Sequence, residues 1–438
     1  MNKNCNSSVA FVTLGCAKNE VDTNNMKERV LDAGYSIADD PECAQAIVVN
    51  TCTFIQSATE ESLDSIFELA GLPALEKGSA KLIVAGCMPA RYGADLEGEL
   101  TEADAFLPCA EEQNIVELLQ TLIGAPSGLC AREQNDEEGL CHSVSQYVKI
   151  SDGCDRFCSY CTIPYIRGRY HSFTFEQIQN DVETAKARGA KEIVLIAQDT
   201  GRWGNDFDKP KTLAWLMDEL AVQHPDTWFR VMYLQPEGIT DELLDVIARN
   251  DNICSYLDIP LQHVDPELLR AMNRKGDAKQ FAHLVERIKN VIPDITLRTT
   301  LIAGFPGETD EQFEALCDFV DEGYFDYVGV FAYSREDGTR AAELPDQIDE
   351  DEKADRAQRL RDLADAVCIP RVAQRCGETM DVLVEGVEED GQLFGRAMCQ
   401  APEVDGVVYI EGAEIGSIVS VSITDTLLYE MEGEQVNG

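Results

Sequence analysis

Residues 153–161 read Gly-Cys-Asp-Arg-Phe-Cys-Ser-Tyr-Cys, and the rest of the fold can be worked out from this stretch. Its cysteines, Cys154, Cys158 and Cys161, are called the loop triad here; their pattern is Cys-x3-Cys-x2-Cys. Thiolates at this spacing can bind three irons of a cubane cluster and leave the fourth iron open for a substrate or cosubstrate. Structural zinc prefers four ligands in paired Cys or Cys/His patterns. We therefore favour an iron–sulfur site over zinc or an unrelated group of thiols.

The sequence around the loop triad alternates between short apolar runs and helical patterns. Strands are expected at 147–150, 193–197, 229–233, 256–259, 296–302 and 327–331, with helices at 175–188, 241–248 and 310–322. About six β/α units on one stretch predict a barrel or partial barrel whose site lies at the carboxyl ends of the strands. The cysteine loop follows the first strand, which places it on that face.

A second set of cysteines follows the apolar runs nearer the N-terminus. The runs at 11–14, 46–49 and 82–85 lead into Cys16, Cys52 and Cys87, called the N-terminal triad here. Short apolar strands separated by helical stretches predict a doubly wound parallel sheet, and the carboxyl ends of its strands meet at one edge. The three thiols can therefore converge on a shared metal. Three unrelated buried cysteines are the alternative.

The chain divides into segments of different composition. We expect an N-terminal domain at 8–124, a linker at 125–141 and a central domain at 142–372, because residues 124–141 combine Pro, Ser, Gly and acidic residues. Residues 375–438 contain short strand and turn patterns without a helical period, and we expect a small β domain there. The fold class is α/β.

Charge restricts the partners of the protein. The 438 residues include 36 Lys and Arg against 80 Asp and Glu, a net charge of −44. Residues 376–438 hold fourteen acidic residues and one basic residue, Arg396. Such a surface repels nucleic-acid phosphates and anionic lipid and would attract a basic protein. Acidity that serves only solubility is the alternative.

The redox state of the sixteen cysteines depends on the compartment of the protein. The N-terminal residues show no signal-peptide pattern, and no apolar run approaches the ~18 residues that span a membrane. We therefore expect a cytoplasmic protein without membrane attachment. Clustered cysteines then point to metal binding or catalysis and not to disulfides.

These motifs together resemble the radical S-adenosylmethionine superfamily and, within it, the methylthiotransferases. The loop triad resembles the superfamily signature, the N-terminal triad resembles the second cluster site of methylthiotransferases, and the tail resembles a TRAM β-barrel. Several stretches are similar to the RimO branch, which modifies an aspartate of the twelfth small-subunit ribosomal protein; they are residues 13–19, 197–200, 235–240, 256–263, 331–334 and 401–406.

The resemblance implies two [4Fe–4S] clusters and S-adenosylmethionine as cofactors. The loop-triad cluster would cleave S-adenosylmethionine reductively, and the resulting 5′-deoxyadenosyl radical would take hydrogen from the β-carbon of the aspartate. The N-terminal cluster would present sulfur, and a second S-adenosylmethionine would supply the methyl group. Tyr160, Gln198, Ile302 and Gly304 would contact S-adenosylmethionine. A low-potential flavodoxin or ferredoxin would supply electrons.

Two other functions stay open from the sequence. A methylthiotransferase of the MiaB type would act on a tRNA adenosine, although the acidic tail and the absence of a basic face speak against stable nucleic-acid binding. A non-catalytic iron–sulfur electron carrier would need no open iron, whereas two sets of three cysteines each leave one iron without a protein ligand.

Overall fold

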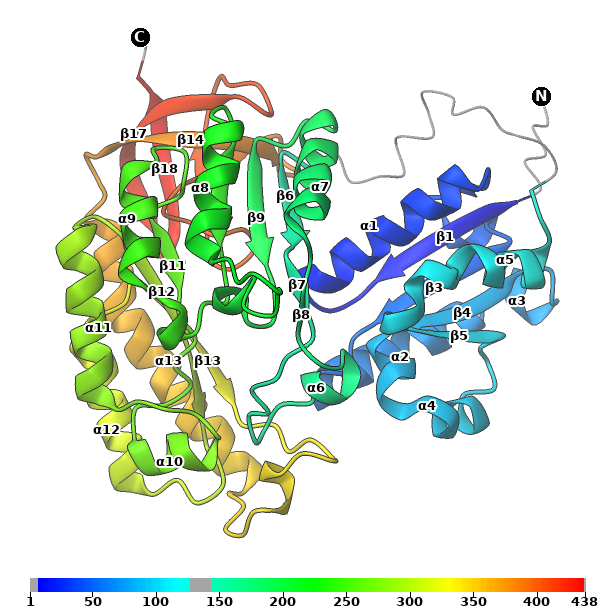
Figure 1. Cartoon of the computed structure of the whole chain (residues 1–438), viewed down its shortest axis with the longest axis horizontal. Helices are drawn as coiled ribbons and strands as arrows, with labels where there is room; N and C mark the ends of the chain where they lie inside the picture. Colours follow the sequence, from blue (N-terminus) through cyan, green and yellow to red (C-terminus); the bar gives the residue numbers. More distant parts are fainter. Residues whose placement is uncertain (1–6, 127–142, 437–438) are drawn as a thin grey trace.

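The computed structural model describes residues 7–126 and 143–436, which form three units (Figure 1). An N-terminal sheet, a larger partial barrel and a small closed barrel follow one another along the chain. Cys130, Cys141 and nearly all of the expected linker at 125–141 lie outside the described residues. Within the described residues, no helix combines the length and the apolar composition needed to cross a membrane.

The N-terminal unit is a five-stranded parallel sheet with the strand order β2-β1-β3-β4-β5. Its central strand β3 is buried at every residue, as expected for a parallel sheet covered on both faces. The strands are β1 (Ser8–Thr13), β2 (Ser36–Ile37), β3 (Ala46–Thr51), β4 (Lys81–Gly86) and β5 (Ala105–Pro108). The predicted doubly wound sheet is confirmed.

Helices cover both faces of this sheet, since adjacent residues of one strand belong to different cores. Val9 packs in a cluster with Met26 and Ile115, whereas Ala10 packs in a second cluster with Ile66. The first face is covered by α1 (Ala17–Asp32) and α5 (Ile115–Ile123), and the second by α2 (Gln56–Ala70) and α4 (Cys87–Glu99).

The central unit contains six parallel strands in the order β6-β9-β10-β11-β12-β13. A bridge between Phe229 and Ile253 joins its two three-stranded halves. The strands are β6 (Ser145–Lys149), β9 (Glu192–Ile196), β10 (Trp228–Val231), β11 (Tyr256–Asp258), β12 (Thr296–Ala303) and β13 (Tyr327–Ala332). All six predicted strands are present, and the partial (β/α)6 barrel is confirmed.

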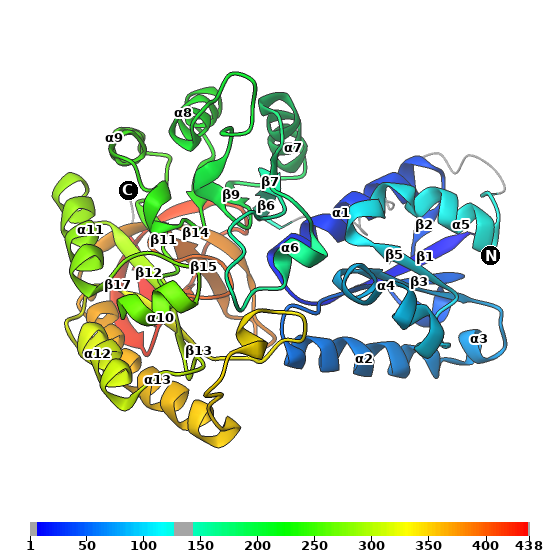
Figure 2. The same ribbon diagram turned by 60° about the horizontal axis from the view of Figure 1, so that its bottom comes forward.

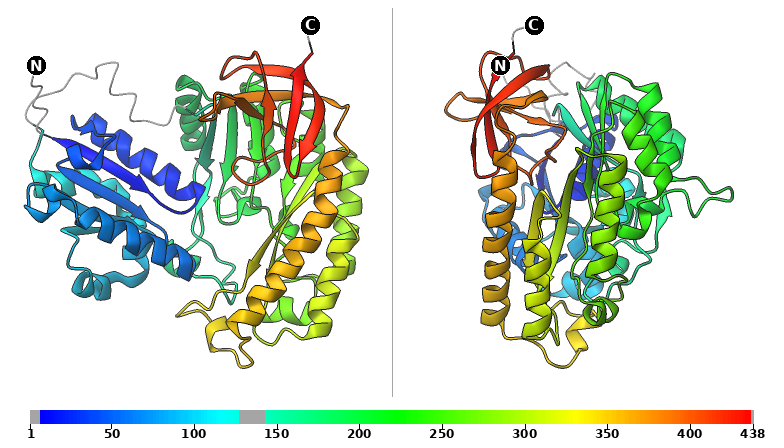
Figure 3. Two further views of the ribbon diagram at one scale, coloured as in Figure 1. Left: turned by 180° about the vertical axis from the view of Figure 1, so that it is seen from behind. Right: turned by 90° about the vertical axis from the view of Figure 1, so that its left-hand side faces the viewer.

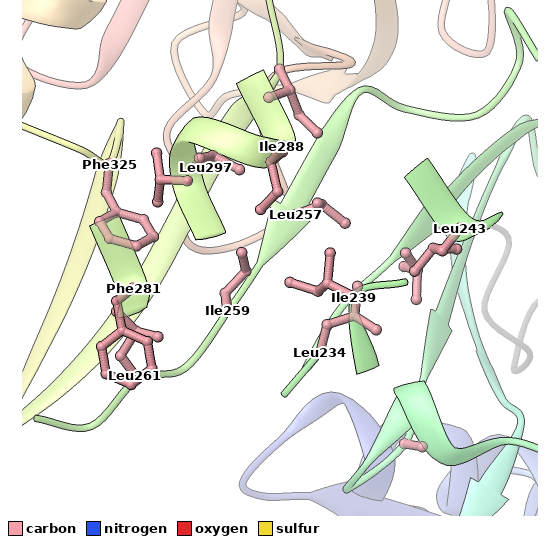
Figure 4. Packing of buried hydrophobic residues seen from close by; sticks show 14 of the residues in the cluster. Leu234, Ile239, Leu243, Leu257, Ile259, Leu261, Phe281, Ile288, Leu297 and Phe325 are labelled. Atoms are coloured by element: carbon pink, nitrogen blue, oxygen red, sulfur yellow. The ribbon is translucent and has the colours of Figure 1, made fainter. Parts of the chain in front are cut away.

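Six helices form an arc around these strands and leave the barrel open on the side that faces the N-terminal unit (Figure 2). They are α7 (Phe175–Ala187), α8 (Leu213–Gln223), α9 (Asp241–Arg249), α11 (Ala278–Val291), α12 (Asp310–Asp321) and α13 (Glu350–Ala373). Reciprocal capping boxes start α7 at Thr174 and α12 at Thr309. Leu257 and Leu297 of the strands pack among Phe281 and the other apolar side chains of the helix layer (Figure 4).

The structure differs from the predicted elements at several strand ends, and three helices of the arc, α8, α11 and α13, had no predicted range. Strand β10 ends at Val231 and not at residue 233, because Tyr233 adopts a left-handed backbone with φ of 63°. Helix α13 was not predicted, since charged residues dominate its sequence. It is nevertheless fixed by packing against β13 and α12.

The C-terminal unit is a small closed β-barrel, as the resemblance implies, and its five strands have the order β14-β15-β16-β18-β17. Its strands are β14 (Thr379–Val387), β15 (Leu393–Ala397), β16 (Val408–Ile410), β17 (Ile418–Leu427) and β18 (Glu430–Gln435). It covers the end of the partial barrel where the strands begin (Figure 3). Trp228, Tyr256 and Tyr327, the first residues of their strands, share a hydrophobic cluster with the small barrel. The opposite end, where cysteines were expected, is left uncovered by it.

A buried ion network fixes the small barrel to the central unit. Arg396 pairs with Glu192 at the start of β9. Arg396 also pairs with Glu385 at 2.6 Å, and Glu192 also pairs with Arg230 at 2.8 Å. The one basic side chain of the small barrel is therefore inside the protein. Residues 376–438 contain no other Lys or Arg, so no basic side chain of this segment offsets its exposed acidic side chains.

Candidate active site

The loop triad lies at the carboxyl ends of the central strands, as the sequence predicts. Its loop leaves the short strand β7 (Ser151–Asp152) through Gly153, whose φ is 72°. A side chain at Gly153 would lie 2.3 Å from the carbonyl oxygen of Arg169, so only glycine fits. The amide of Cys154 donates to the carbonyl of Gly168 over 3.2 Å. The backbone of Gly168 and Arg169 therefore passes directly beside Gly153 and Cys154 at the start of the loop.

Contacts with the barrel fix the middle of the loop. Asn273 donates to the carbonyl oxygens of Arg156 at 2.8 Å and Phe157 at 3.1 Å. Phe157 has φ of 48°, an uncommon conformation for a residue with a side chain. Arg156 pairs with the buried Asp199 at 2.6 Å. These contacts hold the loop in shape through the protein alone.

The three thiols of the loop differ in burial and in proton affinity. Cys154 is buried, while Cys158 and Cys161 are half-buried. Burial, with a further contribution from neighbouring Cys158, raises the pKa of Cys161 to about 12. Iron must therefore displace these protons on binding, since the thiolate is the ligand.

The described residues hold no group of three His, Cys, Asp or Glu side chains that could surround one metal ion. That geometry differs from a cubane site, in which each thiolate binds a separate iron. Both triads fit the cluster better than a single zinc ion, because neither supplies the close tetrahedral set that zinc needs.

Buried oxygen atoms without partners lie in the loop and after the two neighbouring strands β9 and β10. Within the described residues, Ser159 Oγ, Gln198 Oε1 and Gln235 Oε1 have no hydrogen-bond partner. The other amide atom of Gln198, Nε2, donates to Asp152 over 3.0 Å, which fixes the orientation of the side chain. Unpaired buried polar atoms are costly in a folded protein, and a bound polar ligand would satisfy them. S-adenosylmethionine, with several donors and acceptors, fits this set.

Two other predicted contacts lie in the same region. Tyr160 packs against the main core, and burial raises the pKa of its phenol well above the usual range. Ile302 is buried near the end of β12, where its amide donates to the carbonyl of Gln262 over 2.7 Å. Their contact with S-adenosylmethionine stays a prediction.

Gly304 has an architectural explanation of its own. Its amide donates to both carboxylate oxygens of Glu308, at 3.0 and 3.1 Å, and Glu308 pairs with Arg356 at 2.9 Å. A side chain at Gly304 would lie 2.4 Å from Cγ of Lys353 on α13. Packing therefore requires glycine here, and its predicted contact with S-adenosylmethionine is a separate, untested role.

The structure brings the three strand ends of the N-terminal triad together. Asn19 Nδ2 donates to the carbonyl of Leu14 after β1 at 2.9 Å and to that of Thr51 in β3 at 3.0 Å. Its Oδ1 lies 3.7 Å from the sulfur of Cys87, the first residue of α4. Cys52 and Cys87 are buried, and Cys16 is exposed. One asparagine thus ties the three cysteine-bearing segments to one edge of the sheet.

The segments that carry the two triads touch each other. Thr162, which follows the last cysteine of the loop triad, donates to the carbonyl of Phe54 over 3.4 Å. Arg91 Nη1 donates to the carbonyl of Thr53 over 2.6 Å and pairs with Glu336 at 2.9 Å. The two cysteine sites therefore face each other across one interface.

A buried charge network crosses this interface. Arg167 donates from Nη2 to Asn19 and to Asp22, both at 2.8 Å, and from Nη1 to Asp152 at 3.2 Å. Lys149 pairs with the same two aspartates. Burial acts to raise the pKa of Asp152, but Lys149 and Arg167 more than offset it and hold that pKa far below its usual value.

Sequence reasoning missed Asn19, Asp22 and Arg167 as site residues. Asn19 and Asp22 lie three and six residues after Cys16, on the first two turns of α1, which is the available signal for them. Arg167 follows Cys161 but carries no local pattern. Only the folded chain shows that these residues meet. Cys109 also reaches the interface, where its thiol lies 3.4 Å from the carbonyl of Ile166.

Comparisons with known families agree with this architecture. The Radical SAM superfamily matches residues 148–320, the uncharacterized protein family UPF0004 matches 8–108, and the TRAM domain matches 376–436. Fold and site together define a radical S-adenosylmethionine enzyme, a class that works with an iron–sulfur cluster and S-adenosylmethionine.

Relatives specify the family. Proteins named ribosomal protein uS12 methylthiotransferase RimO are 42% identical in Natranaerobius thermophilus, 40% in Geobacter sulfurreducens and 41% in Clostridioides difficile. These alignments cover 98%, 99% and 97% of this chain and 99%, 100% and 98% of the relatives. The chain belongs to the RimO methylthiotransferase family.

Solved structures of more distant proteins share the fold. The radical S-adenosylmethionine methyltransferase TsrM from Kitasatospora setae aligns with a TM-score of 0.54 at 16% identity, over 76% of each chain. The cobalamin-dependent radical enzyme OxsB aligns with a TM-score of 0.50 at 12% identity, over 82% of this chain and 57% of its own. At these identities the likeness concerns architecture alone.

Proposed function

We propose that this protein methylthiolates the β-carbon of an aspartate in ribosomal protein uS12. The observation that carries the proposal is the contact between the segments that carry the two triads, in which Thr162 meets Phe54 and Arg167 meets Asn19 and Asp22. A substrate at this interface can reach both cysteine sites. Relatives that match nearly the whole chain and are named uS12 methylthiotransferases support the substrate protein and the group transferred.

Two [4Fe–4S] clusters are proposed, one on each triad. When bound, they and S-adenosylmethionine supply a carbon radical, sulfur and a methyl group, which the side chains of the protein do not provide. The protein contributes position: Asn273 and Asp199 fix the loop triad, and Asn19 fixes the N-terminal triad. Gln198, Gln235 and Ser159 offer unpaired oxygens to S-adenosylmethionine.

The small barrel is proposed to attract the basic substrate. Of its fourteen acids, Asp405 is buried and Glu385 is paired with Arg396, whereas Glu388, Glu389 and Asp390 are exposed in the turn between β14 and β15. A face of this kind favours encounter with a basic ribosomal protein and disfavours stable binding of RNA. The proposed electron source is a low-potential flavodoxin or ferredoxin, and the proposed location is the cytoplasm.

Mass spectrometry of ribosomal proteins from cells that lack the gene tests the function. The account predicts that one aspartate of uS12 loses a methylthio group and regains it when the gene is restored. Loss of a methylthio group from a tRNA adenosine, with uS12 unchanged, would assign the protein to the other substrate class.

A further inference from the structure

We propose that an acidic electron-carrier protein docks on the outer surface of the loop triad and reduces the cluster there. This surface consists of Phe157, Tyr165, Arg169 and Lys275 and is called the loop face here. Tyr165 lies on α6 (Ile163–Ile166), at the end of the central unit that Figure 2 brings forward. The inference rests on the cluster proposed for the loop triad, because it names the surface through which that cluster receives electrons.

The two segments that form the loop face are basic, although the protein as a whole is strongly acidic. Residues 153–170 and 272–276 together contain five basic residues and one acidic residue, Asp155. The whole chain contains 36 basic residues and 80 acidic residues. The two segments touch each other, since the Ser159 amide donates to the Met272 carbonyl over 3.0 Å. The loop face is therefore a local positive region on a negative protein.

Two of the five basic side chains are neutralised by ion pairs. Arg167 belongs to the buried network that joins the two cysteine sites, where it pairs with Asp22. Arg156 pairs with Asp199 at 2.6 Å and with Glu237 at 3.2 Å. These two arginines support the loop and contribute little charge to its outer surface.

The other three basic side chains leave positive charge at the surface. Arg169 is 74% exposed and pairs with Asp155 at 3.0 Å. Lys275 is exposed and Arg274 is half-buried, and neither forms an ion pair with a described residue. The thiolates of the loop triad add negative charge nearby, which bound iron offsets. The loop face therefore attracts an acidic partner and repels a basic one.

Aromatic side chains form the centre of the loop face. Tyr165 is 59% exposed, and its ring meets the Phe157 ring edge-on with the ring centres 6.3 Å apart. The Arg169 guanidinium lies 5.3 Å from the centre of the Phe157 ring. Aromatic residues and arginine are enriched where proteins bind one another. The loop face thus combines the side chains of a protein interface with the charge that suits an acidic partner.

The loop face lies next to the cysteines whose cluster must be reduced. Phe157 directly precedes Cys158, and the helix that carries Tyr165 begins two residues after Cys161. A carrier docked on these rings is separated from the cluster by the loop itself. One electron leaves the reduced carrier and enters the cluster, and no covalent bond forms or breaks in this step.

The two ends of the central unit therefore sort two partners by charge. The acidic small barrel covers the end where the strands begin, and the loop face lies at the end where the strands finish (Figure 1). A basic ribosomal protein is attracted to the first end and repelled by the second. An acidic carrier has the opposite preference.

Charge reversal on the loop face tests the docking site. The reconstituted enzyme is mixed rapidly with reduced flavodoxin, an acidic electron carrier, and in parallel with reduced methyl viologen, a small cation. Arg169→Glu together with Lys275→Glu should slow reduction by flavodoxin about tenfold or more at low salt, and the difference should shrink as salt rises. Reduction by methyl viologen should stay as fast or become faster. Oxidised flavodoxin, which transfers no electron, should also bind this variant more weakly.

The matched control is Lys77→Glu together with Lys191→Glu, which changes the net charge by the same amount. Lys77 precedes β4 and Lys191 precedes β9, so both exposed side chains lie away from the strand ends that carry the cysteines. The control should behave as the unchanged enzyme does. Equal slowing of flavodoxin in the two double variants would overturn the inference. So would slower reduction by methyl viologen in the loop-face variant, since the two side chains would then support the cluster.

Tyr165→Ala tests the aromatic centre without a change of charge. It should weaken flavodoxin binding about fivefold or more and leave reduction by methyl viologen unchanged. Tighter binding of uS12 to the charge-reversed variant, without weaker binding of flavodoxin, would assign the loop face to the substrate and overturn the inference. An enzyme that accepts electrons through the loop face but leaves uS12 unmodified would instead reject the proposed substrate.

Discussion

Arg167 and Asp22 form an ion pair of 2.8 Å in which the two side chains are only 3% and 1% exposed. Arg167 follows the loop triad, and Asp22 lies on the helix that begins after Cys16. The pair therefore joins the two cysteine sites directly. A buried pair needs good geometry to offset the loss of water from both charges, and here Asn19, Asp152 and Lys149 complete the network.

Removing Arg167 should loosen the junction between the two sites. Arg167→Met leaves Asp22 and Asp152 with Lys149 as their remaining cation, so the free energy of unfolding should fall by roughly 3–5 kcal/mol. Urea unfolding of the metal-free protein measures the change. Arg359→Met is the matched control, because Arg359 pairs with Glu314 at the surface. Equal stabilities for the two variants would show that the buried network does not hold the junction.

The two triads should bind iron independently. Protein reconstituted without oxygen should hold about eight irons if both sites carry cubanes. Replacing the three cysteines of either triad with alanine should remove about half of the iron, as measured by iron and sulfide analysis. One triple replacement that removes all of the iron, or none of it, would refute two separate clusters.

The attachment of the small barrel should weaken in acid. Burial acts to raise the pKa of Glu192, but Arg396 and Arg230 outweigh it and hold the pKa at about 2, below the usual 4.5. A depressed pKa adds stability above pH 4.5, and that stability disappears as the pH falls towards 2. The contribution is about 3 kcal/mol.

Unfolding of the metal-free protein and of Glu192→Gln between pH 7 and pH 2 tests this contribution. The variant should be less stable at pH 7, where Arg396 and Arg230 lose their partner, and the difference should shrink below pH 4.5. A difference that stays constant over this range would show that ionised Glu192 does not attach the barrel.

The exposed acids of the β14–β15 turn should steer the substrate. Replacing Glu388, Glu389 and Asp390 with Gln, Gln and Asn should lower the association rate with uS12 more than it raises the dissociation rate, because peripheral charges act mainly on encounter. The turn should survive, since Asn can still accept the hydrogen bond that Asp390 receives from the Gln392 amide. Glu385 is left unchanged because it pairs with Arg396.

Rapid-mixing kinetics at several salt concentrations measure this effect. The difference between the two proteins should shrink as salt rises, since the screening length is only ~8 Å at physiological ionic strength. Unchanged uS12 binding together with tighter tRNA binding and turnover on tRNA would contradict the proposed substrate.

Much of the fold followed from the sequence because parallel strands place their carboxyl ends at one edge. That rule is independent of distance along the chain, so Cys16, Cys52 and Cys87 could be grouped because each follows the end of a different strand. Contacts between units follow no such rule. The meeting of Arg167 with Asp22 depends on how two separately folded units pack, which leaves no periodic pattern.

Other features of the structure could not be predicted from the sequence, for reasons that are local to each residue. Tyr233 ends β10 early because Asp258 binds its amide and stabilises a left-handed backbone that tyrosine rarely adopts. Lys18 is an ordinary helix residue by sequence, and only its burial above Tyr233 makes it exceptional. The charge of the small barrel could be counted in advance, but the burial of Arg396 could not.

The central claim is that both triads act on one aspartate of uS12, and isotope transfer tests it most directly. The reconstituted enzyme is given S-adenosylmethionine, a reductant and uS12 deuterated at the β-carbons of aspartate. We expect deuterium in 5′-deoxyadenosine and a methylthio group on one aspartate. With the N-terminal triad changed to alanine, 5′-deoxyadenosine should still form without sulfur addition. Deoxyadenosine free of deuterium while uS12 is modified, or full methylthiolation without the N-terminal triad, would contradict the account.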